Sequence, residues 1–441
     1  MTAPFNPGHF NVLKPLSTRR STLLTVIDVG STKIVCLIAR LRPQAADAAL
    51  SGRTHAIEIL GIGHQRSRGI KAGVVVDIDA AERAVRLAVD TAERKAGMTV
   101  ESLLVNMSGG RLASEIFSAH IGLEGRTVGD GDLERLLRAG CQHASRENRQ
   151  IIHAIPIGYR LDGNQGVAIP RGMVGSRLGI DLHTVTVDHA PLQNLGLCLD
   201  RCHLDVDAAI ASAYASGLAS LVDDEAELGA VCIDIGGGTT NLAVFSAGRL
   251  VHVDALAMGG QLQTNAIAQG LSTSLRNAER LKTLYASVVV GDLDNEDIIT
   301  VESPEDGSDD TPMQVTRAAI NGLIAPSVTE ILETTRDRLN ASGFAARAGQ
   351  RIVLTGGASQ LTGLSDAASQ IFGRNVRIGR PLGVKGLPDK AKGPAFSTAI
   401  GLLIYPQLAH LEYLDTHTGT QKRSGSGGYL ARVGQWIRES F

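Results

Sequence analysis

The 441-residue chain is poor in aromatic residues and has few cysteines. Aromatic residues make up 3% of the sequence, with one tryptophan, so a core must be built from aliphatic side chains and alanine. The five cysteines are scattered, which is typical of a reduced, cytosolic protein. Cys198 and Cys202 have helical spacing and precede His203, but no second ligand pair follows, so a metal site there is not favoured.

Long apolar runs and a strong net charge are also missing. Because no stretch of 18 apolar residues occurs, we expect no membrane-spanning helix, and the N-terminus lacks the apolar region of a secretory signal. The net charge of −2 gives no overall attraction to nucleic acid. With 43% hydrophobic and 20% charged residues, the composition is that of a globular protein, whose length predicts roughly two to four modules.

One short pattern occurs twice, at 26–33 and at 232–241. Each copy is an apolar run that ends in an aspartate, Asp28 or Asp234, and then turns through glycine and hydroxyl residues into a second apolar run. This pattern predicts a β-hairpin with an acidic residue at its lip. An ordinary pair of glycine-rich hairpins is the alternative, and the repetition of the pattern in register argues against it.

The chemistry of both hairpins favours a phosphate site. Glycine allows backbone N–H groups to approach an anion closely, and hydroxyls and Lys33 add further donors. Asp28 and Asp234 cannot bind phosphate directly, but they can hold Mg²⁺ through its waters. Two facing hairpins would therefore bind a polyphosphate from both sides.

Other stretches predict the modules around these hairpins. Residues 108–186 change in character and predict a small inserted α+β module. The small residues of 208–217 predict a helix that ends at Gly217. The acidic stretch 291–312 lacks the loop pattern of a calcium site, so a solvated edge is expected. The strand 351–355 runs into Gly356 and Gly357, which suits a seat for a base or ribose.

The C-terminal 36 residues resemble a tether. Residues 406–428 are rich in Gly, Ser and Thr and predict a flexible linker, and 429–441 predict an amphipathic helix that lies on a membrane surface. Docking of this helix on a protein groove is the alternative. The residues that would meet the membrane are Tyr429, Leu430, Arg432, Val433, Trp436, Ile437, Arg438 and Phe441. One such face binds only weakly, so stable attachment would need several copies in one assembly.

Taken together, the motifs resemble the actin, sugar-kinase and chaperone ATPase superfamily, and within it most closely the FtsA family of bacterial cell-division proteins. The resemblance covers roughly residues 22–405 and the last thirteen, and rests on 28–33, 73–77, 234–240, 353–358 and 396–403. It implies an α/β, actin-like ATPase fold of two βββαβα-type domains, with an inserted subdomain 1C in the first half and a C-terminal amphipathic helix.

The resemblance also implies a division of the chain. The implied parts are a disordered tail (1–20), subdomain 1A (21–105, 187–217 and 381–405), the inserted subdomain 1C (106–186), subdomain 2A (218–254 and 331–380), subdomain 2B (255–330), the linker (406–428) and the membrane-targeting helix (429–441).

The family resemblance implies a function at the division site. Its members bind ATP with Mg²⁺, form filaments and tether the tubulin-like FtsZ to the cytoplasmic face of the inner membrane. It places the FtsZ C-terminal peptide at about 255–330, and self-association and later division proteins at subdomain 1C. No nucleic-acid partner is implied.

Residue by residue, the resemblance carries over a nucleotide site. Asp28 and Asp234 would lie near Mg²⁺. The residues implied to contact the nucleotide are Asp28, Gly30, Ser31, Thr32, Lys33, Asp234, Gly236, Gly237, Gly238, Thr239, Thr240, Glu279, Lys282, Gly356, Gly357 and Ala358.

The resemblance leaves enzyme activity open. Related ATPases carry Gln or Glu nine residues before the helix-ending glycine, and counting back from Gly217 gives Ala208, which cannot orient a water. Asp205 and Asp207 are nearby substitutes, so no catalytic residue is assigned and slow or absent hydrolysis is expected. A small-molecule kinase of this fold and a soluble chaperone-like ATPase are the alternatives. The first does not need an amphipathic tail, and the second needs a peptide-binding domain after residue 405.

Overall fold

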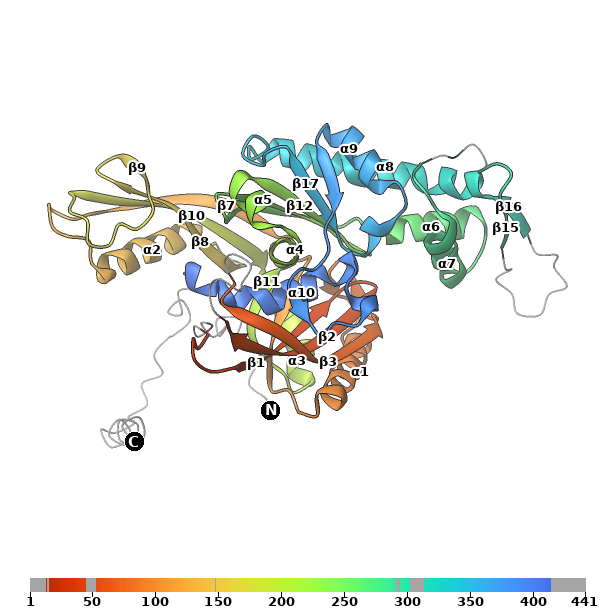
Figure 1. Ribbon diagram of the computed structural model, residues 1–441, viewed down its shortest axis with the longest axis horizontal. Helices are drawn as coiled ribbons and strands as arrows, with labels where there is room; N and C mark the ends of the chain where they lie inside the picture. Colours follow the sequence, from red (N-terminus) through yellow and green to blue (C-terminus); the bar gives the residue numbers. More distant parts are fainter. Residues whose placement is uncertain are drawn as a thin grey trace.

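The computed structural model describes residues 13, 16–44, 53–146, 148–289, 291, 294–301 and 313–413. Two α/β units lie one above the other in the centre, and a smaller unit projects from each end of this body (Figure 1). One small unit carries β7–β10 and α2, and the other carries α6, α7, β15 and β16. The second central unit and the two small units each contain a cluster of buried hydrophobic residues. A further cluster fills the first central unit and extends to residues of the second sheet and of the insert.

The first central sheet has six strands in the order β11-β6-β1-β2-β3-β19. Its strands are β1 (Thr22–Val29), β2 (Lys33–Pro43), β3 (His55–Arg66), β6 (Ser102–Met107), β11 (Asp205–Ala211) and β19 (Val384–Lys385). β1 and β2 form the first predicted hairpin, with Asp28 opposite Val35, and β6 runs parallel to β1. A two-stranded ribbon, β4 (Ile70–Lys71) and β5 (Val74–Val75), follows β3.

Helix α1 (Ile78–Ala96) covers this sheet and has the bounds that its apolar spacing predicts. Its N-cap is Asp77, whose carboxylate accepts from the Ala80 N–H, and Gly97 ends it in the left-handed conformation at φ 67°. α3 (His189–Arg201) packs beside α1. A side chain on Gly63 would collide with the Ala88 carbonyl, so small residues let α1 approach the sheet closely.

The second central sheet has the order β14-β13-β12-β17-β18. Its strands are β12 (Ala230–Ile235), β13 (Thr240–Ser246), β14 (Arg249–Leu256), β17 (Arg351–Thr355) and β18 (Asn375–Ile378). β12 and β13 form the second predicted hairpin, and β17 runs parallel to β12. α5 (Asp223–Leu228), α8 (Arg317–Ala341) and α9 (Leu364–Phe372) belong to this unit. α8 continues through residue 330, the predicted boundary between subdomains 2B and 2A.

The insert is a four-stranded antiparallel sheet with one helix on it. Its elements are β7 (Ala113–Gly122), α2 (Asp130–Ala144), β8 (Arg149–Leu161), β9 (Asn164–Val167) and β10 (Arg177–Asp188). The other small unit contains α6 (Gln261–Gly270), α7 (Leu275–Tyr285), β15 (Ile298–Val301), β16 (Met313–Thr316) and the start of α8. Both units have a buried core of their own.

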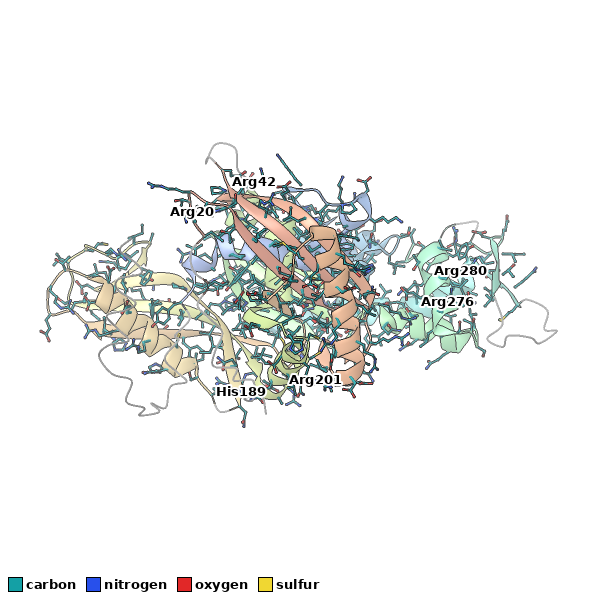
Figure 2. All side chains as sticks on the ribbon, turned by 90° about the horizontal axis from the view of Figure 1, so that it is seen from below. Arg20, Arg42, His189, Arg201, Arg276 and Arg280 are labelled. Carbon is teal, nitrogen blue, oxygen red and sulfur yellow. The ribbon has the colours of Figure 1, made fainter. Side chains whose placement is uncertain are left out.

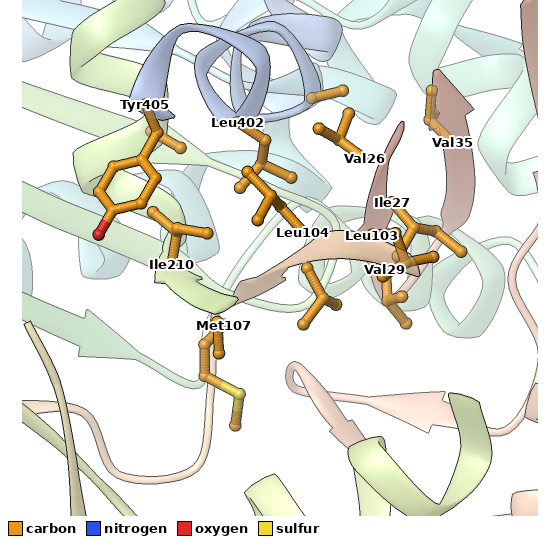
Figure 3. Close-up of a cluster of buried hydrophobic side chains, with 14 of the residues drawn as sticks. Val26, Ile27, Val29, Val35, Leu103, Leu104, Met107, Ile210, Leu402 and Tyr405 are labelled. Carbon is orange, nitrogen blue, oxygen red and sulfur yellow. The ribbon is translucent and has the colours of Figure 1, made fainter. Parts of the chain in front are cut away.

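Two apolar helices, α4 (Ser212–Ser220) and α10 (Ser397–Ile404), cross between the two central sheets. They cross very closely, since any side chain on Gly401 would collide with the Ala215 carbonyl. Leu402 on α10 packs in one buried cluster with Val26 and Leu104 from the first sheet (Figure 3). These two helices therefore connect the sheets that carry the two hairpins.

The predicted helix over 208–217 is wrong at both ends. Residues 205–211 form β11, which adds to β6, and the helix begins at Ser212 and continues through Gly217 to Ser220. Pairing with β6 overrides the helical propensity of the alanine run, because an open sheet position beside β6 satisfies its backbone groups. Gly217 therefore lies inside the helix, and close packing accounts for it, since a Cβ there would be 2.4 Å from the Phe245 ring.

The inner residues of both predicted flexible ends contact the body of the protein. In the tail predicted over 1–20, the Ser17 carbonyl lies 3.0 Å from Nε2 of buried His55, the first residue of β3. In the linker predicted over 406–428, Gln407 is buried and accepts from the backbone N–H groups of Thr54 and His55. The predicted membrane helix 429–441 and linker residues 414–428 lie outside the described residues. Within the described part of the chain, no helix is long and apolar enough to cross a membrane.

Candidate functional site

The tips of the two hairpins meet each other between the two central sheets. Each tip is closed by the same main-chain bond, from the Gly30 N–H to the Lys33 carbonyl (3.0 Å) and from the Gly236 N–H to the Thr239 carbonyl (2.8 Å). A Cβ on Gly237 would lie 2.2 Å from Cγ2 of Thr32. The predicted facing arrangement of the two turns is therefore present.

A cavity of about 140 Å³ lies between these tips. Residues predicted from the sequence make up much of its wall: Asp28, Gly30, Ser31, Thr32, Lys33, Asp234, Gly236, Gly237, Gly238, Thr239, Gly356 and Gly357. Thr240 does not line it, because its hydroxyl donates to the Met258 carbonyl instead. The cavity is rich in backbone N–H and hydroxyl groups, which is the donor set that a phosphate needs.

A second cavity of about 460 Å³ adjoins the first, and the two share Thr32, Gly237 and Gly357 in their walls. Glu279, Lys282 and Ala358 line it, as predicted. The Lys282 ammonium donates to Glu279 (2.7 Å), to the Thr264 hydroxyl (2.8 Å) and to the Gly260 carbonyl (3.0 Å). The smaller cavity between the turns and the wider cavity therefore lie side by side, separated by no more than these shared residues.

Asp28 and Asp234 are both buried at the lips of the hairpins. Burial raises the pKa of Asp28 to about 7; nearby Lys33 lowers it in part, and the charge of Asp234 raises it further. Burial also raises the pKa of Asp234, although hydrogen bonds from Ser216 and Thr398 favour its charged form. Lys33 is a positive charge near both carboxylates, but it does not offset the effect of burial on their pKa values, and a divalent cation would favour their charged forms further.

The donor set fits a hydrated magnesium ion better than a metal held directly by the protein. Among the described residues, no group of three His, Cys, Asp or Glu side chains lies close enough together to hold a metal. Two carboxylates facing a polyphosphate cavity can hold Mg²⁺ through its waters, because Mg²⁺ dehydrates reluctantly and takes phosphate oxygens as further ligands.

Lys33 connects the first hairpin to the segment before α10. Its ammonium donates to the Ala395 carbonyl and lies 3.9 Å from the centre of the Phe396 ring. Burial lowers the pKa of Lys33. A lysine at this place supplies a positive charge next to the phosphate cavity and contacts both walls of it.

The sequence did not reveal several polar residues of the cavity. Asn106 is buried at the end of β6; its side-chain oxygen accepts from the Val29 N–H (2.6 Å), and its amide nitrogen donates to the Ser212 hydroxyl (3.1 Å). Ser108, Ser212, Asn241, Ala395 and Thr398 also line the cavity. The one local signal in the sequence was a polar residue at the end of an apolar run, as at Asn106 after 103–105. Only the order of the strands in the sheet places this residue at the cavity.

Asn241 adds an observation in favour of a ligand. Its side chain is 2% exposed, its nitrogen donates to Thr239, and its oxygen has no hydrogen-bond partner among the described residues. Because leaving a buried polar oxygen unpaired costs free energy, an oxygen that faces a polar cavity is expected to have a ligand or a water as its partner.

Known proteins agree with this geometry. The family model of cell division protein FtsA matches residues 231–401, and the model of the SHS2 domain inserted in FtsA matches 109–186. The cell division protein FtsA of Agrobacterium fabrum is 52% identical over 440 residues, which are 99% of each chain. That of Escherichia coli strain K12 is 30% identical over 428 residues, 95% of this chain and 98% of the relative. The chain belongs to the FtsA family.

A solved structure supports the fold alone. In the PilM–PilN type IV pilus biogenesis complex, a chain 14% identical to this one matches with a TM-score of 0.59, over 87% of this chain and 98% of that one. The architecture is the actin-like ATPase fold, as the family resemblance implied. The insert has the place and extent of the SHS2 domain of FtsA, three residues shorter at its start than the predicted 106–186.

The structure corrects the search for a hydrolytic residue in this FtsA-family chain. β11 runs parallel to β6, with Asp205 opposite Ser102 and Ala211 opposite Met107. Since the far ends of these strands reach the cavity at Asn106 and Ser212, Asp205 and Asp207 lie at the opposite end of β11. Neither can take a proton from a water in the cavity, and Ala208 lies within the strand rather than at the start of a helix.

Proposed function

We propose that this protein binds ATP with Mg²⁺ between its two hairpins, assembles into filaments at the division site, and tethers FtsZ filaments to the cytoplasmic face of the inner membrane. The observation that carries the proposal is the pair of buried aspartates, Asp28 and Asp234, on facing glycine-rich hairpins beside a nucleotide-sized cavity. The relatives named cell division protein FtsA supply the biological setting.

The residues of the site are assigned by their place in the two cavities. Backbone N–H groups of 31–33 and 237–239 would bind the phosphates, Gly30 and Gly236 would let the two turns approach them closely, and Lys33 would add a positive charge. Asp28 and Asp234 would hold Mg²⁺ through water, and the ion would neutralise phosphate charge. Glu279, Lys282, Gly357 and Ala358 would enclose the adenosine, since they line the wider cavity.

We infer that ATP acts mainly as a ligand that sets conformation and assembly. The helix that follows β11 begins with Ser212, whose hydroxyl is a weak general base. Asn106 and Asn241 also line the phosphate cavity, but a neutral amide can at most orient a water and is too weak a base to take its proton. Slow hydrolysis follows, and ATP binding can still shift the chain toward an assembly-competent state.

The partners are assigned to the projecting units. The unit over about 255–330, subdomain 2B, would bind the C-terminal peptide of FtsZ, and its α7 presents Arg276 and Arg280 one helical turn apart (Figure 2). The insert 106–186, subdomain 1C, would mediate self-association and contact later division proteins. The segment 429–441, carried by the linker, would bind lipid.

Co-sedimentation with anionic liposomes tests the tether. The full chain and a chain that ends at Gly428 are compared, each with and without Mg-ATP and each with FtsZ filaments added. We expect the full chain to pellet with lipid, to bring FtsZ into the pellet and to do so more with Mg-ATP, because assembly supplies avidity. Equal pelleting of both chains would contradict the tether.

A further inference from the structure

The root of the C-terminal tail, residues 409–413, is fastened to the body of the protein by a buried acid. Glu412 is 2% exposed at its side chain and lies 2.9 Å from Nδ1 of His153, which is fully buried on β8 of the insert. The Tyr405 hydroxyl donates to the same carboxylate oxygen at 3.2 Å, and the Tyr214 hydroxyl also hydrogen-bonds to Glu412. A main-chain hydrogen bond also connects the tail root to β8, from the Tyr413 N–H to the Ala154 carbonyl at 2.8 Å.

His153 uses its second ring nitrogen at the end of β11, one residue before the cavity-lining Ser212. The Ala211 N–H donates to Nε2 of His153 at 3.0 Å. Because Nε2 accepts, it carries no proton in the neutral ring, so Nδ1 carries the proton and donates it to Glu412. One imidazole therefore connects the tail root to the residue that caps α4.

α4 in turn carries residues of the phosphate cavity. Ser212 follows Ala211 directly and lines the cavity, and Ser216, one turn later, donates to Asp234. Aromatic rings hold the imidazole in place, since Tyr214 and Tyr405 both contact it edge-on at 5.2 and 5.7 Å between ring centres. Tyr405 lies in the same buried cluster as Ile210, the residue before Ala211 (Figure 3).

We propose that His153 and Glu412 are positioning residues that couple nucleotide binding at α4 to the docking of the tail root. Buried hydrogen bonds run from Ala211, next to Ser212, through His153 to Glu412, so a nucleotide that fixes the start of α4 also restrains His153, and with it the acid at the tail root. By thermodynamic linkage the coupling is reciprocal: docking of the root raises the affinity for ATP by the factor by which ATP raises docking.

This inference rests on the proposed nucleotide site and adds to the proposed tether a path from that site to residues 409–413, the last that the structure describes. The chain continues for another 28 residues beyond Tyr413. A tail root that is held more firmly in the ATP-bound state would give the membrane segment a more defined starting point when filaments assemble.

Hydrogen exchange on the full-length chain, with and without Mg-ATP, tests the coupling. In the unaltered protein we expect ATP to slow exchange at the hairpins and also, about fivefold or more, at residues 405–413. In Glu412→Ala, ATP should still protect the hairpins, but the root should exchange fast and no longer respond. ATP affinity should fall by a similar factor in this variant.

Two further variants separate coupling from simple damage. Glu412→Gln keeps an oxygen that accepts from Nδ1 of His153 and should retain the response of the root to ATP. Leu411→Ala changes an exposed neighbour on the same turn and should behave like the unaltered protein. If ATP protects the hairpins but leaves 405–413 unchanged in the unaltered protein, or if Glu412→Ala responds as fully, the inference is overturned and the nucleotide site stands. If ATP protects neither region, both proposals fail.

Discussion

Thr32 and Gly237 meet at the tips of the two hairpins, so closely that a single methyl group on Gly237 would lie 2.2 Å from Cγ2 of Thr32. Residues 205 positions apart in the sequence thus share one wall of both cavities. The contact sets the separation of the two turns, and with it the width of the phosphate cavity. Any nucleotide that enters must fit the space that this pair leaves.

Gly237→Ala should push the hairpins apart. We expect a loss of about 1–3 kcal/mol in the free energy of unfolding, which is typical of overpacking, together with weaker ATP binding. Adding Thr32→Ser removes the colliding methyl and should restore part of both. Gly122→Ala is the control, because a Cβ there meets nothing within 4 Å. Thermal unfolding and ATP titration of the four chains measure the effect; unchanged ATP affinity in Gly237→Ala would refute it.

Asp28 should make the ATP-free protein less stable as the pH rises. Its pKa is raised from 3.8 to about 7, so the native state keeps a proton that the unfolded chain loses over that range. Stability contributed by this group is therefore present below about pH 4 and is lost as pH rises to about 7, by at most about 4 kcal/mol at 1.36 kcal/mol per pKa unit.

Asp28→Asn removes this titration. The free energy of unfolding of the variant should exceed that of the unaltered protein by more at pH 8 than at pH 5. The variant should also lose Mg-ATP binding. Asp90→Asn, on the exposed face of α1, is the control. Denaturant unfolding at several pH values measures the difference between variant and parent. The same pH slope in both chains would show that Asp28 keeps its charge in the folded state.

Ser212→Ala should weaken ATP binding more than ADP binding. Ser212 lines only the phosphate cavity and not the wider one, so it lies toward the terminal phosphate. Because its oxygen accepts from Asn106, its own proton is available to a phosphate. A lost hydrogen bond to a charged group costs on the order of tenfold in affinity.

The control for Ser212→Ala is Ser220→Ala, a buried serine on the same helix whose hydroxyl donates to the Ser216 carbonyl and does not line the cavity. Isothermal titration with ATP and with ADP gives the two affinities. An equal loss for both nucleotides would mean that Ser212 acts on the fold or on the inner phosphates instead.

Arg276→Glu should weaken binding of the FtsZ C-terminal peptide. Arg276 is exposed on α7 beside exposed Leu275, a combination of charge and apolar surface that suits an acidic peptide segment. We expect affinity to fall severalfold, with a smaller dependence on salt. Fluorescence anisotropy of a labelled peptide measures it, with Lys385→Glu on the first sheet as a charge-matched control. Equal affinity of both variants would place the peptide elsewhere.

Much of the fold is determined by patterns that act locally. Both predicted hairpins form, because their periodicity and turn chemistry agree, although β1 begins at Thr22 and β2 continues to Pro43, beyond the predicted pattern. α1 ends at Gly97, where a glycine suits a helix end. The same local reasoning failed at 208–211, where alanines favour a helix but pairing with β6 makes a strand. Propensity is weak there compared with the free energy of completing a sheet.

The sequence by itself determined the donors of the nucleotide site, since Asp28, Lys33, Asp234 and the glycines belong to two recognisable turns. Only the tertiary structure decided which other residues complete it. Asn106 and Ser212 come from separate strands and helices, and no spacing in the sequence relates them to Val29. Likewise, Glu412 reads as linker sequence, and it becomes part of the core only because the insert places His153 beside it. Such contacts join segments distant along the chain, so they exist only once the sheets and the insert have packed together.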